Sequence, residues 1–391
     1  MLLYSKLAEN SMKLSFGTVK GGFSQDLEKK GLEVLQKGLS EEVFPGGAGG
    51  IIIDRRDIKE NVVWICGHTD HYCSREVQRT TFYDLASLTK PLVTVLSLLV
   101  LIEKNLVTWN TPLADLLQRS VPVDKKGINL TGLLQHSSGL PAYKPYYLGL
   151  MQYADEQVRK ARMVDWILNE PIEYMSGTKT IYSDLGFILL GHAIEQLSGE
   201  SLDAFWETNV ALPLLLDKKL LFSPKRKKIS NSLVASTELC PWTKKMLCGE
   251  VHDENCRSMG GVAGHAGLFG TVEGVLSICS HLLRQWRGDE EHPNYSSNLL
   301  RHIFEYRSDS AWRYGFDTPS KINSSSGQLF SSLSVGHLGF TGTSFWIDLE
   351  RGVAVVLLTN RVHPSRANEK IRWFRPIFHN AVMQSVIKLI T

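Results

Sequence analysis

A serine and a lysine stand three residues apart at the start of a strongly apolar stretch, "FYDLASLTKPLVTVLSLLVLIEKN" at 82–105. Residues i and i+3 share one face of a helix, so the ammonium group of Lys90 can reach the hydroxyl of Ser87. A helix N-terminus favours the negative charge of an alkoxide or an oxyanion. An apolar environment favours the neutral form of a lysine, which can accept a proton. The pair therefore has the chemistry of a nucleophile and its base.

A purely structural interpretation of the same pair also exists, in which Ser87 caps the helix and the stem of Lys90 carries its charge to solvent. The local sequence leaves both interpretations open. Ser-x-x-Lys occurs twice more, at Ser176–Lys179 and Ser385–Lys388. An internal glycine indicates a turn at the first of these, and the second lies deep in a terminal helical pattern. Only Ser87 begins an apolar helix.

Composition narrows the class of protein. The 391 residues are 43% apolar and 21% charged, which is typical of a soluble globular protein, and the length suggests two or three domains. A net charge of +3 is too small to indicate a nucleic-acid surface, and the basic cluster at 223–230 is typical of a solvated loop. The N-terminus lacks the apolar stretch of a secretory signal, and Pro91–Ile102 is shorter than the about 20 residues of a membrane span. We therefore expect a cytoplasmic protein without a membrane span, although a mis-assigned start codon would change that expectation; the oligomeric state stays open.

The cysteines raise the question of a metal site. Six are scattered along the chain: Cys66, Cys73, Cys240, Cys248, Cys256 and Cys279. Without a signal peptide, we expect reduced thiols instead of a disulfide framework. Cys240, Cys248, His252 and Cys256 recur at near-regular intervals, but no tight C-x2-C pair is present. The spacing favours ordinary semi-buried thiols over zinc, and we expect neither metal nor cofactor.

Two segments, one near each end of the chain, have the pattern of β-hairpins. The runs Gly50–Asp54 and Asn61–Cys66 are rich in β-forming residues and are joined by a charged turn. Residues 343–360, "TSFWIDLERGVAVVLLTN", form the second hairpin, with its turn at 350–352. Antiparallel strands from the two ends can share one sheet.

Helical patterns surround these hairpins. Leucines at roughly helical spacing predict an amphipathic helix over 25–39, and a long helix is predicted from Ser87 to Asn105. The tail 367–390 predicts a closing helix with a bend near Pro376. Residues 106–259 show short helical patterns broken by proline and glycine, with little strand character.

These elements predict an α+β fold of two domains. Residues 1–105 and 260–391 form the sheet domain with its terminal helices, and 106–259 form a helical domain. The active site is expected in the cleft between them.

Further motifs follow the first in a recognisable order. Tyr182-Ser183-Asp184 precedes a helical pattern, and His337-Leu338-Gly339 precedes a strand. Ser-x-x-Lys with Ser-Asp-Asn and Lys-Thr-Gly is the signature of β-lactamases and penicillin-binding proteins. The chain resembles the serine β-lactamase-related hydrolases: class C β-lactamases, low-molecular-mass D-alanyl-D-alanine peptidases and their esterase relatives. Six segments across most of the chain carry the resemblance: "DLASLTK", "LLQHSSGLP", "YSDLGFILLG", "VHDENCRSMGGVAGHAGLFGT", "GHLGFTGTSFWID" and "TNRVHP". It implies the β-lactamase-like fold, an antiparallel sheet flanked by N- and C-terminal helices plus an all-helical insert.

The resemblance also implies roles for individual residues. Ser87 is the nucleophile, Lys90 its proton partner, and Tyr182 the second acid–base group. His337 takes the place of the lysine in Lys-Thr-Gly, and the backbone N–H groups of Ser87 and Phe340 form the oxyanion hole. The residues assigned to substrate binding are Asp184, Gly339, Phe340 and Thr341.

Two positions depart from the β-lactamase pattern. Asp184 stands where class C enzymes have asparagine, and His337 replaces a permanently charged lysine. Both departures favour a peptidase or an esterase over a β-lactamase. With an ordinary pKa of about 6.5, His337 is expected to bind substrate carboxylates better at mildly acidic pH.

The sequence thus predicts a serine hydrolase that acts through an acyl-enzyme on amide or ester bonds, most nearly a β-lactamase-like or D-alanyl-D-alanine peptidase-type enzyme. Its expected partners are small-molecule or peptide acyl substrates, including cell-wall fragments, and no nucleic acid. The alternatives are a carboxylesterase of the same fold and a non-catalytic sensor or scaffold; the intact Ser87, Lys90 and Tyr182 favour an enzyme.

Some polar residues receive no catalytic role. The glycine-rich segment 260–270 indicates a tight backbone passage beside the site instead of a phosphate cradle, since no Gly-Lys-Ser/Thr follows. His265 within it has no assigned role, although it could support the site from behind. The acids of His252-Asp253-Glu254 are expected to be solvated, and His136 to shape a turn.

Overall fold

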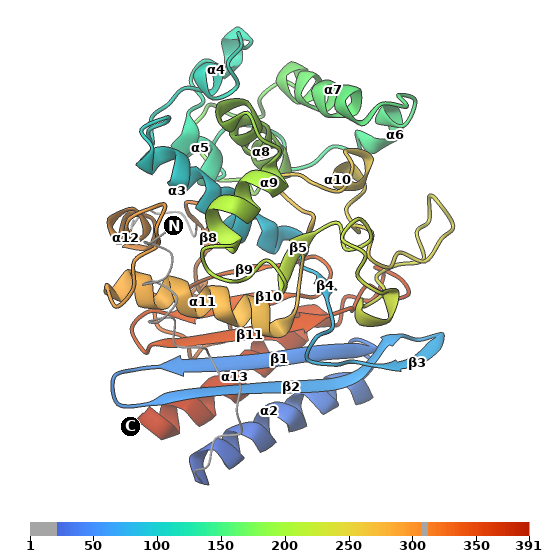
Figure 1. Ribbon diagram of the computed structural model, residues 1–391, viewed down its shortest axis with the longest axis vertical. Coiled ribbons are helices and arrows are strands. Elements are labelled where there is room, and N and C mark those ends of the chain that lie inside the picture. The colour runs from blue at the N-terminus through green and yellow to red at the C-terminus, as the bar shows by residue number, and fades with distance from the viewer. Residues whose placement is uncertain (1–21, 306–311, 391) are drawn as a thin grey trace, which may run out of the picture.

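An eight-stranded antiparallel sheet forms the base of the molecule (Figure 1). The computed structural model describes residues 22–305 and 312–390. The strand order is β3-β2-β1-β11-β10-β9-β8-β7, so strands from the two ends of the chain pair at its centre, as predicted. The strands are β1 (Gly46–Asp54), β2 (Lys59–Asp70), β3 (Cys73–Glu76), β7 (Trp312–Arg313), β8 (Phe316–Asp317), β9 (Val335–Leu338), β10 (Ser344–Asp348) and β11 (Val353–Thr359).

Both predicted hairpins are present, but β1 starts earlier than expected. Its first residues are mostly glycines, which weaken a strand pattern in sequence. A Cβ atom on Gly49 would lie 2.8 Å from the ring of Phe378, so a side chain there would push the terminal helix away from the sheet. The second hairpin turns at Gly352, whose φ of 68° suits glycine.

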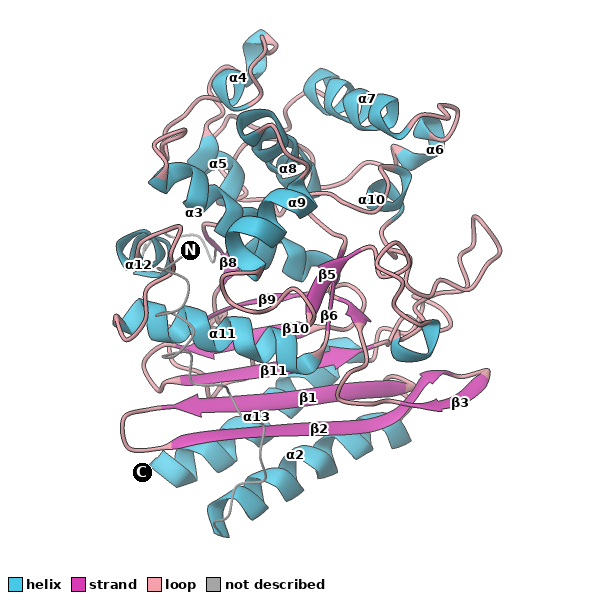
Figure 2. Ribbon diagram, in the orientation of Figure 1, coloured by secondary structure: helices cyan, strands magenta, loops and turns pink. Residues whose placement is uncertain are grey.

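Helices cover both faces of the sheet (Figure 2). The helices are α2 (Gly22–Ser40), α3 (Leu96–Glu103), α4 (Leu113–Leu116), α5 (Leu130–Leu134), α6 (Tyr147–Leu150), α7 (Glu156–Asn169), α8 (Asp184–Ser198), α9 (Leu202–Trp206), α10 (Glu254–Ser258), α11 (Val272–Arg287), α12 (Ser297–Glu305) and α13 (Ile371–Ile390). Along β11, Val353 and Val355 pack with α2 and α13, whereas Ala354 and Val356 pack with α11. This alternation with period two buries both faces, and the predicted α+β fold with flanking terminal helices is confirmed.

The middle of the chain is mainly helical and lies above the sheet in Figure 2. A small antiparallel sheet joins this helical part to the base, in the order β4 (Tyr83–Asp84), β6 (Leu268–Gly270) and β5 (Leu220–Phe222). The strand β5 therefore connects the middle segment to strands that precede and follow it. The division into 106–259 and the rest stays a prediction.

The predicted long helix runs from Ala86 to Glu103. It begins as a 3-10 turn (Ala86–Leu88), continues as a π-helix (Lys90–Val95) and ends as α3. Proline has no N–H to donate, so Pro91 cannot complete a regular α-helical ladder, and π-segments are frequent at functional sites. Among the described residues this is the one helix long and apolar enough to cross a membrane, but 83% of it is buried within the protein, as in a core helix.

Candidate active site

A strained turn presents Ser87 at the start of the long helix. Ala86 has a φ of 49°, a conformation that residues other than glycine rarely adopt. Its N–H donates to Oδ1 of Asp84 at 2.8 Å, and the other carboxylate oxygen accepts the N–H of His252 at 2.7 Å. Burial raises the pKa of Asp84, although these two hydrogen bonds oppose the rise. Asp84, to which the sequence analysis gave no role, thus holds the turn that places Ser87 at the surface of the site.

Lys90 is completely buried beneath Ser87 and contacts the predicted residues of the second motif. Its Nζ lies 3.0 Å from Oγ of Ser87, 2.7 Å from Oδ1 of Asp184 and 3.2 Å from the carbonyl oxygen of His265. It also lies 4.7 Å above the ring of Tyr182. Burial lowers the pKa of Lys90, but Asp184 and Tyr182 outweigh burial, and the net direction is upward. The expectation of a neutral lysine is therefore wrong, because a carboxylate from a distant part of the chain stabilises the charged form of Lys90.

Tyr182 stands beside this pair in an aromatic setting. Its ring centroid lies 4.6 Å from that of His136 and 5.1 Å from that of Trp312. Burial raises the pKa of Tyr182, while the ammonium group of Lys90 opposes the rise. Tyr182 is therefore a neutral phenol at pH 7 and can donate a proton to a departing group.

His337 is buried behind Tyr182, with 6.0 Å between the two ring centroids. Its Nδ1 lies 2.8 Å from the carbonyl oxygen of Leu338, so the neutral ring carries its proton on Nδ1. Burial, together with the charge of Lys90, lowers the pKa of His337 to about 3. The expectation of an ordinary pKa is wrong, and His337 supplies no positive charge at mildly acidic pH.

The link between β9 and β10 docks on the segment before Ser87. The hydroxyl of Thr341 donates to the carbonyl of Asp84 at 2.7 Å, and that of Thr343 donates to the carbonyl of Leu85 at 3.1 Å. A Cβ atom on Gly339 would lie 2.6 Å from the same Leu85 oxygen, so only glycine permits this approach. The link thus lies against the segment that carries Ser87, as an oxyanion hole requires. The hydroxyl group of Thr341 helps to hold the two segments together, because its proton is donated to the carbonyl of Asp84.

Phe340 projects from this link and is 51% exposed. The guanidinium carbon of Arg361 lies 4.5 Å from the centroid of its ring, and the imidazole of His252 stacks on the ring at 5.5 Å. Among the described residues, the N–H of Phe340 donates to no backbone acceptor. The N–H group predicted to serve the oxyanion hole is therefore not used in a backbone hydrogen bond within the described residues.

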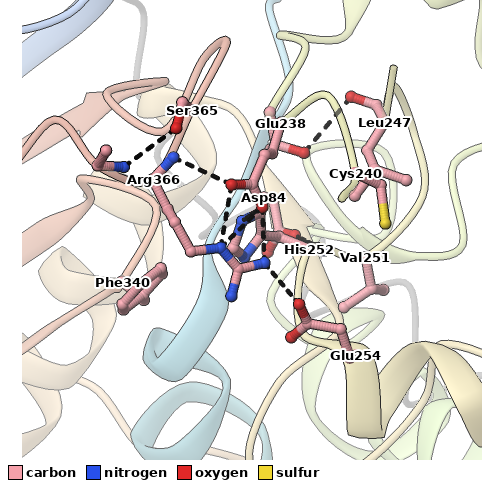
Figure 3. A network of polar contacts seen from close by, with 12 residues as sticks. Asp84, Glu238, Cys240, Leu247, Val251, His252, Glu254, Phe340, Ser365 and Arg366 are labelled. Atoms are coloured by element: carbon pink, nitrogen blue, oxygen red, sulfur yellow. Dashed lines mark hydrogen bonds and ion pairs between the residues drawn. The ribbon is translucent and has the colours of Figure 1, made fainter. Parts of the chain in front are cut away.

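Arg366 completes a network of charges next to Phe340 (Figure 3). Its Nη2 donates to Oε2 of Glu238 at 2.6 Å and to Oε1 of Glu254 at 2.5 Å. The neighbouring Asp253 lies 2.8 Å from Nε2 of His265, and its pKa is lowered because this contact outweighs burial. The expectation that the acids at 253–254 are solvated is wrong; the basic partners that hold them come from remote segments.

The glycine-rich segment 260–270 is a tight backbone passage, as predicted. The carbonyl of Gly264 accepts the hydroxyl of Thr94 at 2.6 Å, and a Cβ atom on Gly264 would lie 2.1 Å from the carbonyl oxygen of Phe187. His265 contributes its backbone oxygen to Lys90 and its ring to Asp253.

His136 shapes a turn, as predicted, and also supports Tyr182. It has a φ of 56°, and its Nδ1 accepts the N–H of Ser183 at 3.1 Å. This bond fixes the backbone immediately after Tyr182.

The candidate zinc residues are engaged in other contacts. His252 lies 3.0 Å from Glu238, and the thiol of Cys256 donates to the carbonyl of Ala266 at 3.2 Å. In the described part of the chain, no three His, Cys, Asp or Glu side chains form a group that could hold a metal ion. The side chain of Cys73 is outside the described atoms. The cysteines found as free thiols are Cys66, Cys240, Cys248, Cys256 and Cys279.

This arrangement can activate a serine through a relay of two proton transfers. Because Lys90 is already protonated, it must lose one proton before it can accept another from Ser87. Asp184 is the carboxylate in contact with it and can take that proton. Tyr182 can protonate the departing group. The fold and this site are those of a serine hydrolase.

Comparison with known proteins gives the same class. The sequence profile of the Beta-lactamase family matches residues 30–375, and the chain belongs to this family. A putative D-alanyl-D-alanine carboxypeptidase of Salmonella typhi is 32% identical over 313 residues, which cover 74% of this chain and 72% of the relative. An N-acetylmuramyl-L-alanine amidase of Bacillus subtilis is 30% identical over 353 residues, which cover 82% and 78%. The structure of EstCE1, a hydrolase with promiscuous acyltransferase activity, has a TM-score of 0.67 at 20% identity and covers 90% of this chain and 99% of its own.

Proposed function

We propose that the protein is a serine amidase that cleaves amide bonds of cell-wall peptide fragments. The observation that carries the proposal is the buried Lys90, whose Nζ lies 3.0 Å from Oγ of Ser87 and 2.7 Å from Asp184. Both curated relatives are named for an alanine-containing substrate, D-alanyl-D-alanine in one and N-acetylmuramyl-L-alanine in the other, which supports this class.

The reaction has two stages. Oγ of Ser87 bonds to the substrate carbonyl carbon while its proton passes to Lys90 and a lysine proton passes to Asp184. The amine then departs with a proton from Tyr182, which leaves an acyl-enzyme. Water then hydrolyses the acyl-enzyme. A proton of the water returns to Tyr182, Ser87 regains its proton from Lys90, and Lys90 regains its own from Asp184.

The first candidate bond is the D-alanyl-D-alanine amide. Its leaving group carries a carboxylate beside the scissile nitrogen, and enzymes of the Lys-Thr-Gly pattern meet that charge with a lysine. Here the neutral His337 occupies that position, with its pKa lowered to about 3. This observation favours a second candidate, the amide between the muramyl lactyl group and L-alanine. The leaving group of that reaction carries no carboxylate beside the scissile nitrogen.

A single substrate separates the two candidates. A muramyl pentapeptide that ends in D-alanyl-D-alanine contains both bonds, and mass spectrometry of the products distinguishes free D-alanine from free pentapeptide. We expect one of these products from the wild type and neither from Ser87→Ala. If neither bond is cleaved while p-nitrophenyl esters are, the protein is an esterase of the same fold and the amidase proposal fails.

A further inference from the structure

A second buried cation approaches the site from the terminal helix. Arg375, in α13, is 7% exposed, and its Nη2 donates to the carbonyl of Gly339 at 2.6 Å and to the carbonyl of Thr343 at 3.0 Å. These carbonyls belong to the two ends of the link between β9 and β10. In Figure 1, α13 lies on the opposite face of the sheet from α3.

No carboxylate neutralises this guanidinium among the described residues. Arg361 behaves similarly: its Nε donates to the carbonyl of Phe340 at 2.9 Å, and its Nη1 donates to the carbonyls of Arg366 and Asn368. Burying a cation is costly unless its hydrogen bonds are satisfied. Two arginines that hold consecutive carbonyls, those of Gly339 and Phe340, therefore require an explanation beyond packing.

The geometry of the peptide unit supplies one. The carbonyl of Gly339 and the N–H of Phe340 belong to the same planar trans peptide and point in opposite directions. A guanidinium that holds the carbonyl therefore also fixes the direction of the N–H, which points away from the guanidinium. Gly339 itself lies against the segment before Ser87, since a Cβ atom on it would be 2.6 Å from the carbonyl oxygen of Leu85. A cation on the carbonyl oxygen also polarises the amide, which makes its N–H a stronger donor.

We propose that Arg375 is a positioning residue of the oxyanion hole, which orients and polarises the Gly339–Phe340 peptide so that the Phe340 N–H stabilises the oxyanion. The proposal rests on the serine hydrolase function. When Oγ of Ser87 bonds to the substrate carbon, the π-electron pair of the carbonyl moves to its oxygen, and it returns when the leaving group departs. The strengthened N–H stabilises that charge during the interval.

Arg375→Met tests the proposal because it removes the charge while keeping an apolar stem. Both carbonyls keep another donor in this variant: Gly342 N–H lies 3.1 Å from the Gly339 oxygen, and Gly339 N–H lies 2.7 Å from the Thr343 oxygen. We expect kcat for a p-nitrophenyl ester to fall about 10-fold to 100-fold, below the full loss of an oxyanion donor, with little change in KM. Arg375→Lys, which keeps a cation and a donor, should recover part of this loss.

A matched pair of oxo and thiono esters separates oxyanion stabilisation from general damage. Sulfur accepts hydrogen bonds poorly, so the wild type should prefer the oxo ester, and this preference should shrink in Arg375→Met and be intermediate in Arg375→Lys. Arg372→Met is the control, because Arg372 is an exposed arginine of the same helix that pairs with Glu369 at 2.9 Å. It should change neither kcat nor the preference.

The proposal is overturned if folded Arg375→Met keeps its kcat, or if kcat falls while the oxo-to-thiono ratio stays at the wild-type value. If Arg375→Met does not fold, the ratio in folded Arg375→Lys decides: the wild-type ratio overturns the proposal. A wild type that hydrolyses neither ester and is not labelled by a fluorophosphonate overturns the hydrolase function itself, and this inference with it.

Discussion

Lys90 and Arg375 are two buried cations, one in contact with Ser87 and the other with the link that carries Phe340, and their surroundings differ. Lys90 contacts the carboxylate of Asp184 at 2.7 Å, whereas the hydrogen bonds of Arg375 within the described part of the chain go to backbone carbonyls. The carboxylate raises the pKa of Lys90. Burial, with Arg361 nearby, lowers the pKa of Arg375 to about 9, which leaves the guanidinium charged at pH 7.

This difference matches two different tasks. A group that exchanges protons needs a partner that can take one, and a carboxylate is such a partner. A group that only orients a peptide needs a permanent charge, and an arginine on carbonyl dipoles keeps its charge throughout the reaction. The site therefore combines one cation that changes its protonation with another that does not.

Removal of Lys90 should have the largest effect. Lys90→Met leaves Ser87 without a proton acceptor, and turnover of a p-nitrophenyl ester should fall about 10²- to 10⁴-fold. Adding Asp184→Asn to this variant should cost no further activity, because Asp184 acts through Lys90. A further large loss in the double variant would show that Asp184 contacts the substrate independently, as the sequence analysis expected.

Asp184→Asn, made with Lys90 intact, should change the dependence of kcat/KM on pH. The carboxylate raises the pKa of Lys90, so its removal lowers that pKa. In the relay Asp184 takes the lysine proton, so the variant can activate Ser87 only when Lys90 has lost its proton to solvent. We therefore expect kcat/KM of Asp184→Asn to be lower than that of the wild type near pH 7 and to rise with pH as Lys90 becomes neutral. Asp165→Asn, at a more exposed carboxylate 2.9 Å from Arg119, is the control and should leave the profile unchanged. Identical profiles for wild type and Asp184→Asn would contradict the relay.

Arg366, unlike Arg375, forms ion pairs with carboxylates. We expect this network to affect the stability of the fold more than the catalytic rate. Burial would raise the pKa of Glu238, but hydrogen bonds from His252 and Arg366 lower it to about 2. The ionised Glu238 therefore stabilises the fold fully above its unfolded pKa of about 4.5, and this contribution is lost as the pH falls toward about 2.

Glu238→Gln lacks this pH-dependent contribution. We expect it to lose about 1–3 kcal/mol of unfolding free energy at pH 7, and less as the pH falls below about 4.5. Urea unfolding at several pH values measures both quantities. Glu369→Gln, in an exposed pair with Arg372, should have almost no effect. A loss that is independent of pH would show that Glu238 contributes through packing and not through its charge.

His337 should show the smallest response of all. Because its pKa is lowered to about 3, its ring stays neutral from pH 5 to pH 8. The imidazole C–H resonance, assigned with His337→Gln, should show no titration in that range by NMR. A midpoint near the ordinary value of about 6.5 would restore the hypothesis that His337 binds substrate carboxylates at mildly acidic pH.

The elements and the central residues could be predicted because their signals are local. Runs of β-forming residues joined by turns marked both hairpins, and the apolar run after Ser87 marked the core helix. The motifs containing Lys90 and Tyr182 placed both beside Ser87. The glycine start of β1 could not be predicted, since it depends on the close approach of remote segments, such as Phe378 of α13 at Gly49 and Leu276 of α11 at Gly50.

Charge states and supporting residues could not be predicted, because they depend on neighbours remote in sequence. The pKa of Lys90 is set by its contact with Asp184, and that of His337 by burial within the finished fold. Arg375 and Asp84 look like ordinary charged residues in sequence. Only the folded backbone shows that one holds the carbonyl of Gly339 and the other the turn before Ser87.

The account depends most directly on Ser87 as the nucleophile. The decisive measurement is peptide mapping by mass spectrometry after reaction with a fluorophosphonate. We expect one adduct, on Ser87, with no labelling of Ser87→Ala and normal labelling of Ser176→Ala. An adduct on Ser176, or hydrolysis of a p-nitrophenyl ester by Ser87→Ala at the wild-type rate, would contradict the account.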